Sequence, residues 1–277
     1  MLYYYMGIYL TPLEQGSHDE ATMLARNFNQ MAQSLQTLET ERKNLIADIA
    51  HELRTPLTIL QSRLDAYEDG IVPLSLEEMG KLSLQTQLLT RLVEDLRVLS
   101  LAEAGRLTIR KCTLEMGNLL QDVLLGFADH FKAKNIQLHF QTPATLWINA
   151  DPDRLTQVLV NLFNNALRHT PDNGWVRLEL ISKNGELLLS LTDSGQGISP
   201  ENLGKVFNRF FRESEERNRE SGGTGLGLSI VKTLLELHGG RVEASNAKGA
   251  GAQFRVYLPL HSSVIHKIFR TTVLKDK

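Results

Sequence analysis

One histidine lies in a stretch that could supply a nucleophile. Apolar residues recur at three- and four-residue steps within Leu45–Leu64 and predict a helix with a narrow apolar seam: Ile46, Ile49, Leu53, Leu57, Leu60 and Leu64. His51 lies away from that seam, so the helix would present its imidazole to solvent. Glu52 adjoins it, Thr55 follows one turn later, and Pro56 should bend or loosen the helix there. An exposed imidazole beside a carboxylate is a candidate nucleophile, although a lone exposed histidine is more often only a surface residue.

A second set of polar residues could bind a metal-complexed anion. Within residues 151–170, which begin with a helix-capping Asp-Pro pair, Asn161, Asn165 and Arg168 follow one another at spacings of four and three beside an apolar arc. Asparagine is a poor helix former, so two on one face need a reason. An amide oxygen can ligate a hard cation without adding negative charge, and a guanidinium can neutralise phosphate. Solvated asparagines on an ordinary surface helix are the alternative explanation.

The segment DSGQGI, residues 193–198, follows an apolar strand and could recognise a base. Asp193 offers an acceptor to an amino group, which is a donor. Gly195 and Gly197 would let the backbone approach a ligand closely, because they carry no Cβ. A motif of this length also occurs in ordinary turns, so on its own it is a weak indication.

Two further segments could close such a site and bind phosphate. Residues 206–212, VFNRFFR, carry aromatic side chains that could anchor a lid or fill the core: Phe207, Phe210 and Phe211. The charged residues 212–223 have the composition of a mobile loop. Residues 222–232, GGTGLGLSIVK, then place glycines at a helix start, where free backbone amides can meet phosphate: Gly223, Gly225 and Gly227. This is not a Walker loop, because no Gly-Lys-Ser/Thr follows at the required spacing.

The composition of the whole chain limits the classes of function. Its 277 residues suffice for two domains, each with a core of its own. A net charge of −2 gives no indication of nucleic-acid binding. Cys112 is the only cysteine, so an intramolecular disulfide is impossible and a reducing compartment is expected. No apolar run is long enough to span a membrane, and the opening MLYYYMGIYL is interpreted as the stump of a membrane segment or a non-native leader.

The candidate nucleophile needs a long helix and a partner to position it. No glycine or proline interrupts residues 21–55, which predicts one continuous helix that could carry upstream motion to His51. Residues 67–75, YEDGIVPLS, predict the turn into a second helix at about residues 75–101. Each helix has one strong apolar stripe, and a single hairpin cannot bury both stripes. Two copies can do so as a four-helix bundle, so the pattern predicts a homodimer.

The candidate binding residues need a second domain of mixed structure. Gly105 is predicted to end the second helix and to open a hinge. Helical segments then alternate with short strands, the helices at 119–131, 151–170 and 228–238 and the strands at 136–140, 146–150 and 253–260. Asn184-Gly185 joins two strands within residues 175–193 and is a strong hairpin indicator. Helices segregated from a mixed sheet predict an α+β sandwich.

Five motifs resemble those of one known family. HELRTPL, residues 51–57, resembles the phosphoacceptor box of the sensor histidine kinases of two-component signalling. The four segments described above resemble, in chain order, the N, G1, F and G2 boxes of the GHKL ATPases: 151–170, 193–198, 206–212 and 222–232. Residues 18–35 resemble the second helix of a HAMP signal-relay module, although a plain coiled-coil helix explains that segment equally well.

This resemblance implies ATP-dependent autophosphorylation of His51, phosphotransfer to an aspartate on the receiver domain of a response regulator, and phosphatase activity towards that regulator. Glu52 would keep one ring nitrogen protonated, and Thr55 would position water for dephosphorylation. Magnesium would be held chiefly by Asn165, with Asn161 beside it. The implied ATP contacts are Asn161, Asn165, Arg168, His169, Asp193, Gly195, Gly197, Phe207, Gly223, Thr224, Gly225, Leu226 and Gly227.

The resemblance also implies a domain order. Residues 1–40 would form a partial HAMP-like signalling helix, 41–104 the dimerisation and histidine phosphotransfer domain, 105–262 the catalytic ATP-binding domain of the GHKL (Bergerat) fold, and 263–277 a tail. The expected location is the cytoplasm, either as a free protein or as the cytoplasmic portion of an inner-membrane sensor whose membrane segment is absent from this chain.

Two other functions are compatible with parts of the sequence. A GHKL ATPase could drive conformational change, as in chaperones or topoisomerases, but HELRTPL on a dimerisation helix argues against that class. A non-catalytic scaffold could bind nucleotide and a partner, but the intact Asn165, Asp193 and glycine loops argue against it.

Overall fold

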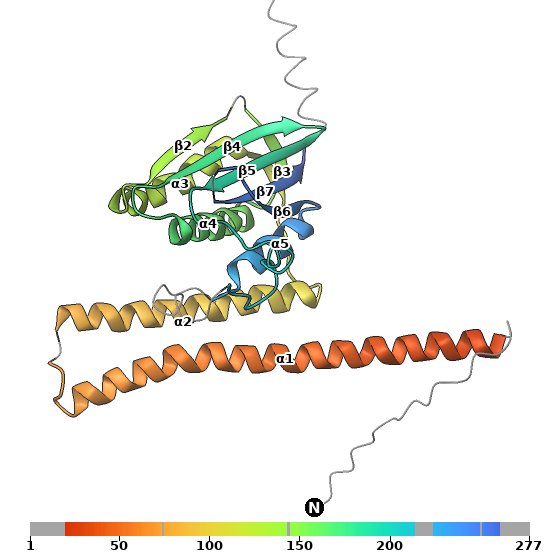
Figure 1. Cartoon of the computed structure of the whole chain (residues 1–277), viewed down its shortest axis with the longest axis horizontal. Coiled ribbons are helices and arrows are strands. Elements are labelled where there is room, and N and C mark those ends of the chain that lie inside the picture. Colours follow the sequence, from red (N-terminus) through yellow and green to blue (C-terminus); the bar gives the residue numbers. More distant parts are fainter. Residues whose placement is uncertain (1–19, 74, 143–144, 214–223, 250, 261–277) are drawn as a thin grey trace, which may run out of the picture. The chain divides into compact units, whose positions relative to one another are not determined.

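The computed structural model describes residues 20–73, 75–142, 145–213, 224–249 and 251–260 (Figure 1). It divides the chain into two compact units, Met1–Leu76 and Glu77–Lys277. The opening MLYYYMGIYL and the C-terminal tail, both discussed above, lie outside the described residues. Within those ranges no helix combines the length and the apolar character that a membrane span requires.

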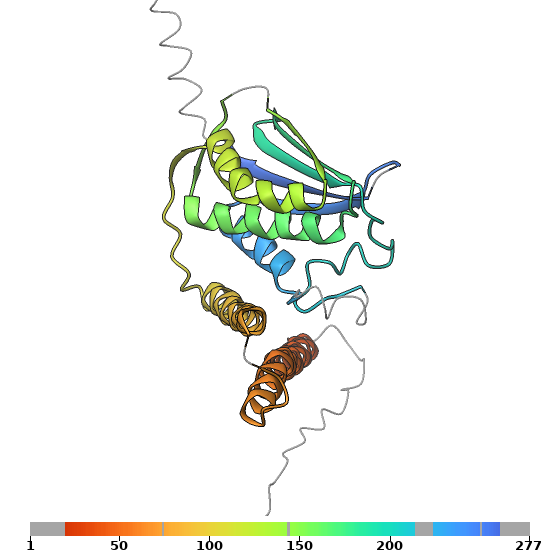
Figure 2. The same ribbon diagram turned by 90° about the vertical axis from the view of Figure 1, so that its left-hand side faces the viewer.

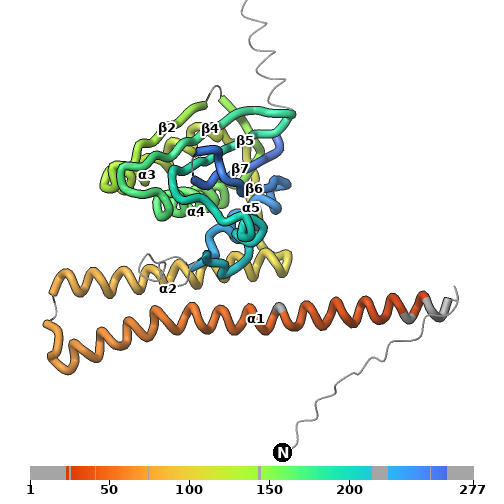
Figure 3. Tube along the Cα trace, viewed as in Figure 1, coloured from red at the N-terminus to blue at the C-terminus, as the bar shows by residue number. Residues whose placement is uncertain are grey.

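The first unit contains a single long helix, α1, which spans Glu20–Glu68 without interruption. The prediction of a continuous helix is therefore confirmed. Pro56 lies inside α1, and the tube in Figure 3 bends in the C-terminal third of the helix, where this proline lies. The side chains of the predicted apolar seam differ in exposure. Ile49 and Leu53 are half-buried, whereas Ile46 and Leu57 are each 56% exposed. An exposed apolar row of this kind needs a partner to cover it.

The second helix, α2, spans Leu76–Glu103 and belongs almost entirely to the second unit. Gly105 ends it with φ +63, and the backbone amides of Arg106 and Leu107 both donate to the carbonyl of Leu101, at 2.8 and 3.1 Å. This left-handed cap confirms the predicted end of the helix.

The sheet of the second unit follows a mixed topology. Five strands pair in the order β2-β4-β5-β7-β6, with β2 parallel to β4 and every other pair antiparallel. Their bounds are β2 Gln137–Gln141, β4 Trp175–Lys183, β5 Glu186–Asp193, β6 Arg241–Asn246 and β7 Ala252–Pro259. Asn184 and Gly185, with φ of 54 and 79, form the predicted turn between β4 and β5.

Three helices cover one face of this sheet (Figure 2), namely α3 Met116–Ala133, α4 Pro152–His169 and α5 Gly227–Leu237. The predicted α+β sandwich is thus confirmed. Phe163 of α4 is fully buried and packs edge-to-face on Phe127 of α3, with ring centroids 5.5 Å apart. The opposite face carries polar side chains, where Gln253 donates to the hydroxyls of Ser190 and Thr192 at 3.1 and 3.0 Å.

Both ends of α4 are fixed by side-chain hydrogen bonds, from its own N-cap residue and from Lys134 after α3. The Asp151 carboxylate caps the N-terminus and accepts from the amides of Asp153 and Arg154 at 3.1 and 3.2 Å. Lys134 donates to two carbonyl oxygens at the C-terminus, 2.9 and 3.2 Å away. The Asp151 amide donates to Nε2 of buried His238 at 3.0 Å, so that ring is the neutral Nδ1-protonated tautomer, and burial lowers its pKa. These contacts hold the face of α4 that carries the asparagines.

Two short strands were not anticipated. β1, Cys112–Glu115, lies between the predicted hinge and α3 and pairs with β3, Trp147–Ala150, in a separate two-stranded sheet. β6 forms the edge of the large sheet. Each is too short, or too mixed in polarity, to stand out by periodicity.

Candidate functional site

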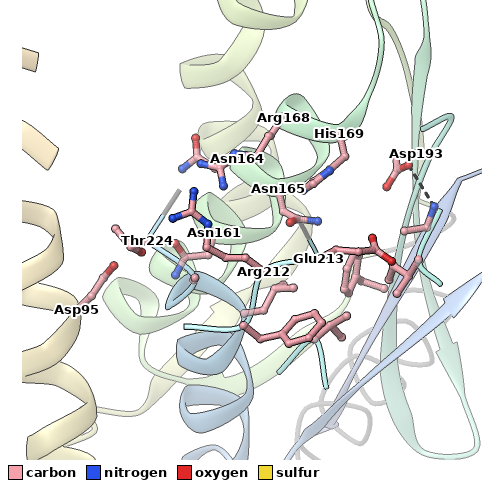
Figure 4. Close-up of a pocket in the computed structure, with 18 of the residues that line it drawn as sticks. Asp95, Asn161, Asn164, Asn165, Arg168, His169, Asp193, Arg212, Glu213 and Thr224 are labelled. Atoms are coloured by element: carbon pink, nitrogen blue, oxygen red, sulfur yellow. Dashed lines mark hydrogen bonds between the residues drawn. The ribbon is translucent and has the colours of Figure 1, made fainter. Parts of the chain in front are cut away.

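A pocket in the second unit gathers most of the predicted ligand contacts (Figure 4). Residues from α2, α4, the loops after β5 and the start of α5 surround it. Predicted contacts in the lining are Asn161, Asn165, Arg168, His169, Asp193, Gly197, Thr224, Gly225 and Gly227. Lining residues outside the set of predicted contacts are Arg91, Asp95, Asn164, Ile198, Val206, Phe211, Arg212, Glu213, Leu228, Ala252 and Phe254.

Asp193 is the most strongly constrained polar group in the pocket. It is 1% exposed at the end of β5. Its Oδ1 accepts from the amides of Gly195 and Ala252 at 2.9 and 3.1 Å, whereas its buried Oδ2 has no partner among the described residues. Burial raises the pKa of this carboxyl group, against the opposing effect of the two amides. One oxygen is therefore held rigidly, and the other is available to a ligand that donates a hydrogen bond.

A close approach of two backbone segments, residues 193–195 and 251–252, builds this arrangement. The Gly251 amide donates to the carbonyl of Asp193 at 2.9 Å. A Cβ on Gly251 would lie 2.2 Å from Oδ1 of Asp193 and 2.5 Å from the Gly195 nitrogen, so only glycine fits there. Asn246 of β6 fixes the adjoining loop, because its side chain accepts from the Ile198 amide at 2.8 Å and donates to the Ile198 carbonyl at 2.6 Å. Neither Gly251 nor Asn246 belongs to the motifs that predicted the site.

The polar stripe of α4 forms another wall. Asn161, Asn165 and Arg168 all line the pocket, and Asn164 joins them. Burial lowers the pKa of Arg168, and the positive charges of Arg212 and Arg91 lower it further. The amide oxygens of Asn161 and Asn165 are ligands of the kind that magnesium prefers. Within the described ranges there is no cluster of three or more His, Cys, Asp or Glu side chains suited to a metal ion.

The glycine-rich segment reaches the pocket at the start of α5. The Thr224 hydroxyl accepts from the Leu226 amide at 3.3 Å. Gly225 has φ +69, and a Cβ there would lie 2.8 Å from backbone atoms of Phe210, so the loop requires a glycine. Gly223 lies outside the described residues.

Three predicted contacts do not line the pocket. The ring of Phe207 packs edge-to-face on Phe254 of β7, with centroids 6.4 Å apart, and Phe211 lines the pocket instead. Leu226 is fully buried. The backbone amide of Gly195 donates to the carboxylate of Asp193, so this glycine supports a lining residue without lining the pocket itself. Phe207 and Leu226 do not line this pocket, so their contacts with a ligand stay predictions.

The candidate nucleophile belongs to the other unit and is described there alone. His51 is exposed on α1, as predicted. The Thr55 hydroxyl donates to the His51 carbonyl at 3.3 Å and is itself exposed. Such a bond to the preceding turn accompanies helix bending and adds to the effect of Pro56.

Family comparisons agree with both halves of this description. Residues 150–262 match the family model described as histidine kinase-, DNA gyrase B-, and HSP90-like ATPase. Residues 41–105 match the one described as His Kinase A (phospho-acceptor) domain. The fold and the pocket therefore define an ATPase domain of the GHKL class, joined to a phosphoacceptor domain.

Comparison with individual proteins shows to which family within this class the chain is similar. The signal transduction histidine-protein kinase BaeS of Escherichia coli (strain K12) is 35% identical over 262 residues, which are 95% of this chain and 56% of BaeS. The structure of the Acinetobacter baumannii histidine kinase AdeS matches with a TM-score of 0.66 and 29% identity over 76% of this chain and 98% of AdeS. The chain belongs to the sensor histidine kinases of two-component systems.

A further structure shares the fold. It is that of histidine kinase ThkA in complex with response regulator protein TrrA, with a TM-score of 0.64 and 23% identity over 88% of this chain and 68% of that one. The chain spans about half the length of the curated relatives it matches.

Proposed function

We propose that this chain binds ATP with magnesium in the pocket of its second unit, transfers the γ-phosphoryl group to His51, and passes it to an aspartate of a response-regulator receiver domain. The observation that carries the proposal is Oδ2 of buried Asp193, which has no partner in the part of the chain that the structure describes. An ionised or neutral carboxyl oxygen that is buried without a partner is costly, and the amino group of adenine supplies the missing donor.

The opposite side of the pocket suits the phosphates. Arg168 supplies positive charge, and the glycine-rich start of α5 supplies backbone amides. Magnesium, when bound, would offset negative charge on the phosphates, with Asn165 as its chief protein ligand and Asn161 beside it. The domain order follows: residues 41–104 carry the phosphoacceptor and residues 105–262 the nucleotide site.

The chemistry at His51 is a nucleophilic substitution. The lone pair of the unprotonated ring nitrogen forms the new phosphorus–nitrogen bond, and the bond to the bridging oxygen breaks with its electron pair leaving on ADP. Glu52 would hold the proton on the second ring nitrogen, which keeps the first nitrogen free to attack. That proton is lost once the phosphoryl group is bound, which leaves a neutral imidazole ring in the phosphohistidine.

Two features support the proposed partners. Large apolar side chains on α1, including Leu24, Leu35 and Leu38, are 60–71% exposed in the single chain, which supports burial against a second copy. The ThkA structure contains the response regulator TrrA, which supports a receiver domain as the second partner.

Labelling with γ-³²P-ATP tests the main proposal. The wild-type chain should acquire acid-labile label, and His51→Ala should lose it while ATP binding is retained. His139→Ala, which removes an exposed histidine of β2, should label normally. ATP hydrolysis without label on the protein would instead indicate a GHKL ATPase of another class.

Asn165→Ala tests the metal site. The variant should lose magnesium-dependent ATP binding and labelling while it keeps its fold, because Asn165 lies on the pocket face and not in the core. Binding that is unchanged both with and without magnesium would remove Asn165 from the metal site.

Thr55→Ala tests the phosphatase activity. The Thr55 oxygen keeps lone pairs that could orient a water molecule against the phosphoaspartate of a regulator, whereas phosphorylation of His51 needs no such water. The variant should therefore label normally and dephosphorylate the regulator slowly. Equal losses of both activities would assign Thr55 only a role in the helix bend.

A further inference from the structure

The pocket has two chemically different ends. Figure 4 places Asp193 on one side and Asp95 of α2 on the other, with Thr224 and Asn161 between Asp95 and the rest of the pocket. If Asp193 receives the adenine, the phosphates extend towards α2. That helix contributes two residues to the lining, Arg91 and Asp95, and both belong to the same compact unit as the pocket.

This second end is rich in positive charge. Arg91, Arg168 and Arg212 all line the pocket. The charges of Arg212 and Arg91 both lower the pKa of Arg168, so each of these two guanidinium groups is near enough to repel that of Arg168. Asp95 is the one acidic residue that α2 contributes to the lining, and the other two carboxylates of the lining, Asp193 and Glu213, come from other segments. An anion placed among the guanidinium groups would relieve this repulsion.

A separate contact ties α2 to the same side of the catalytic domain. Arg209, in the loop that precedes the glycine-rich segment, forms an ion pair with Glu103 at the end of α2. Two turns of α2 upstream, Asp95 is 6% exposed, and the charge of Arg91 one turn earlier stabilises its ionised form. Arg91 itself remains exposed and so can reorient towards a ligand.

We propose that Arg91, a residue of the phosphotransfer domain, is a phosphate contact of the nucleotide pocket and completes a three-arginine anion site with Arg168 and Arg212. This inference rests on the ATP site proposed above and adds a residue that lies outside the four nucleotide boxes. Arg91 reaches the phosphates only when α2 lies against the catalytic domain. Binding of the triphosphate therefore stabilises the packing of α2 on that domain, and this packing in turn strengthens triphosphate binding.

Nucleotide affinity in the full chain tests the proposal. ATP, ADP and AMP are titrated against a fluorescent ATP analogue with wild type, Arg91→Ala and Arg97→Ala. Arg91→Ala should weaken ATP binding by about tenfold, the effect of losing one charged hydrogen bond, and should leave AMP binding unchanged. Arg97→Ala is the matched control, because Arg97 is exposed on the same helix, donates to Glu94 at 3.0 Å and does not line the pocket.

The outcomes separate the two proposals. If wild type binds ATP and Arg91→Ala binds ATP as tightly as Arg97→Ala does, the role of Arg91 is wrong and the ATP site stands. Equal weakening of ATP and AMP would also overturn it, because the effect would not lie at the phosphates. A wild-type chain that binds none of the three nucleotides would overturn the ATP site and this inference together.

Discussion

Replacing Asp193 with asparagine should change which purine the pocket accepts. Oδ1 of Asp193 accepts from two backbone amides, at 2.9 and 3.1 Å, so in the variant the amide oxygen must occupy that position. The amino group of the asparagine then takes the place of Oδ2, which has no partner among the described residues. Asp193→Asn would thus present a donor where the wild-type chain presents an acceptor.

The size of the effect follows from this exchange. ATP would lose a hydrogen bond to a charged acceptor, worth about 1.5–3 kcal/mol, which corresponds to about 10- to 150-fold in affinity. ITP carries an oxygen where ATP carries the amino group, so it should bind the variant better than it binds wild type. The substitution should not lower the stability of the fold. Burial already raises the pKa of Asp193, and a neutral amide costs less free energy to bury than an ionised carboxylate.

Competition of ATP and ITP against a fluorescent nucleotide measures both affinities in one preparation. Asp129→Asn, at an exposed position of α3, should leave both unchanged. Equal losses for ATP and ITP in Asp193→Asn would indicate general damage to the pocket. An unchanged affinity for ATP would refute the adenine contact itself.

Three further changes have definite expected results. Gly251→Ala should lower ATP affinity at least tenfold because its Cβ would lie 2.2 Å from Asp193, whereas Gly204→Ala, which meets nothing within 4 Å, should not. Phe163→Ala should cost about 3–5 kcal/mol in urea unfolding. Burial raises the pKa of Asp95 to about 6 from 3.8, so stability should fall as pH rises between these values, and Asp95→Asn should be more stable than wild type at pH 8.

The polar stripe of α4 could be predicted because helical spacing is local information. Asn161, Asn165 and Arg168 lie on one face by the period of the helix alone, and the Asp-Pro pair before them marks where that helix begins. The same reasoning predicted the unbroken α1 and the hairpin at Asn184.

The other walls of the pocket depend on contacts between distant segments. Ala252 reaches Asp193 across 59 positions, and Asn246 reaches Ile198 across 48. No periodic pattern relates such pairs, so the sequence does not indicate which glycine or asparagine will meet the other loop. The orientation of Phe207 could not be predicted for a related reason, because residues 206–213 form turns in which spacing does not define a face.

Asp151 links the nucleotide site to the chain that leads from the phosphotransfer domain. Its Oδ1 caps α4, while its Oδ2 accepts from the amide of Arg110, in the segment between α2 and β1, at 2.8 Å. Its own amide donates to His238, at the end of the helix that begins with the glycine-rich segment. A shift of the segment around Arg110 would therefore act on the start of α4 and on the end of α5. Because both helices contribute residues to the pocket lining, this one carboxylate connects the segment that follows α2 with two walls of the pocket.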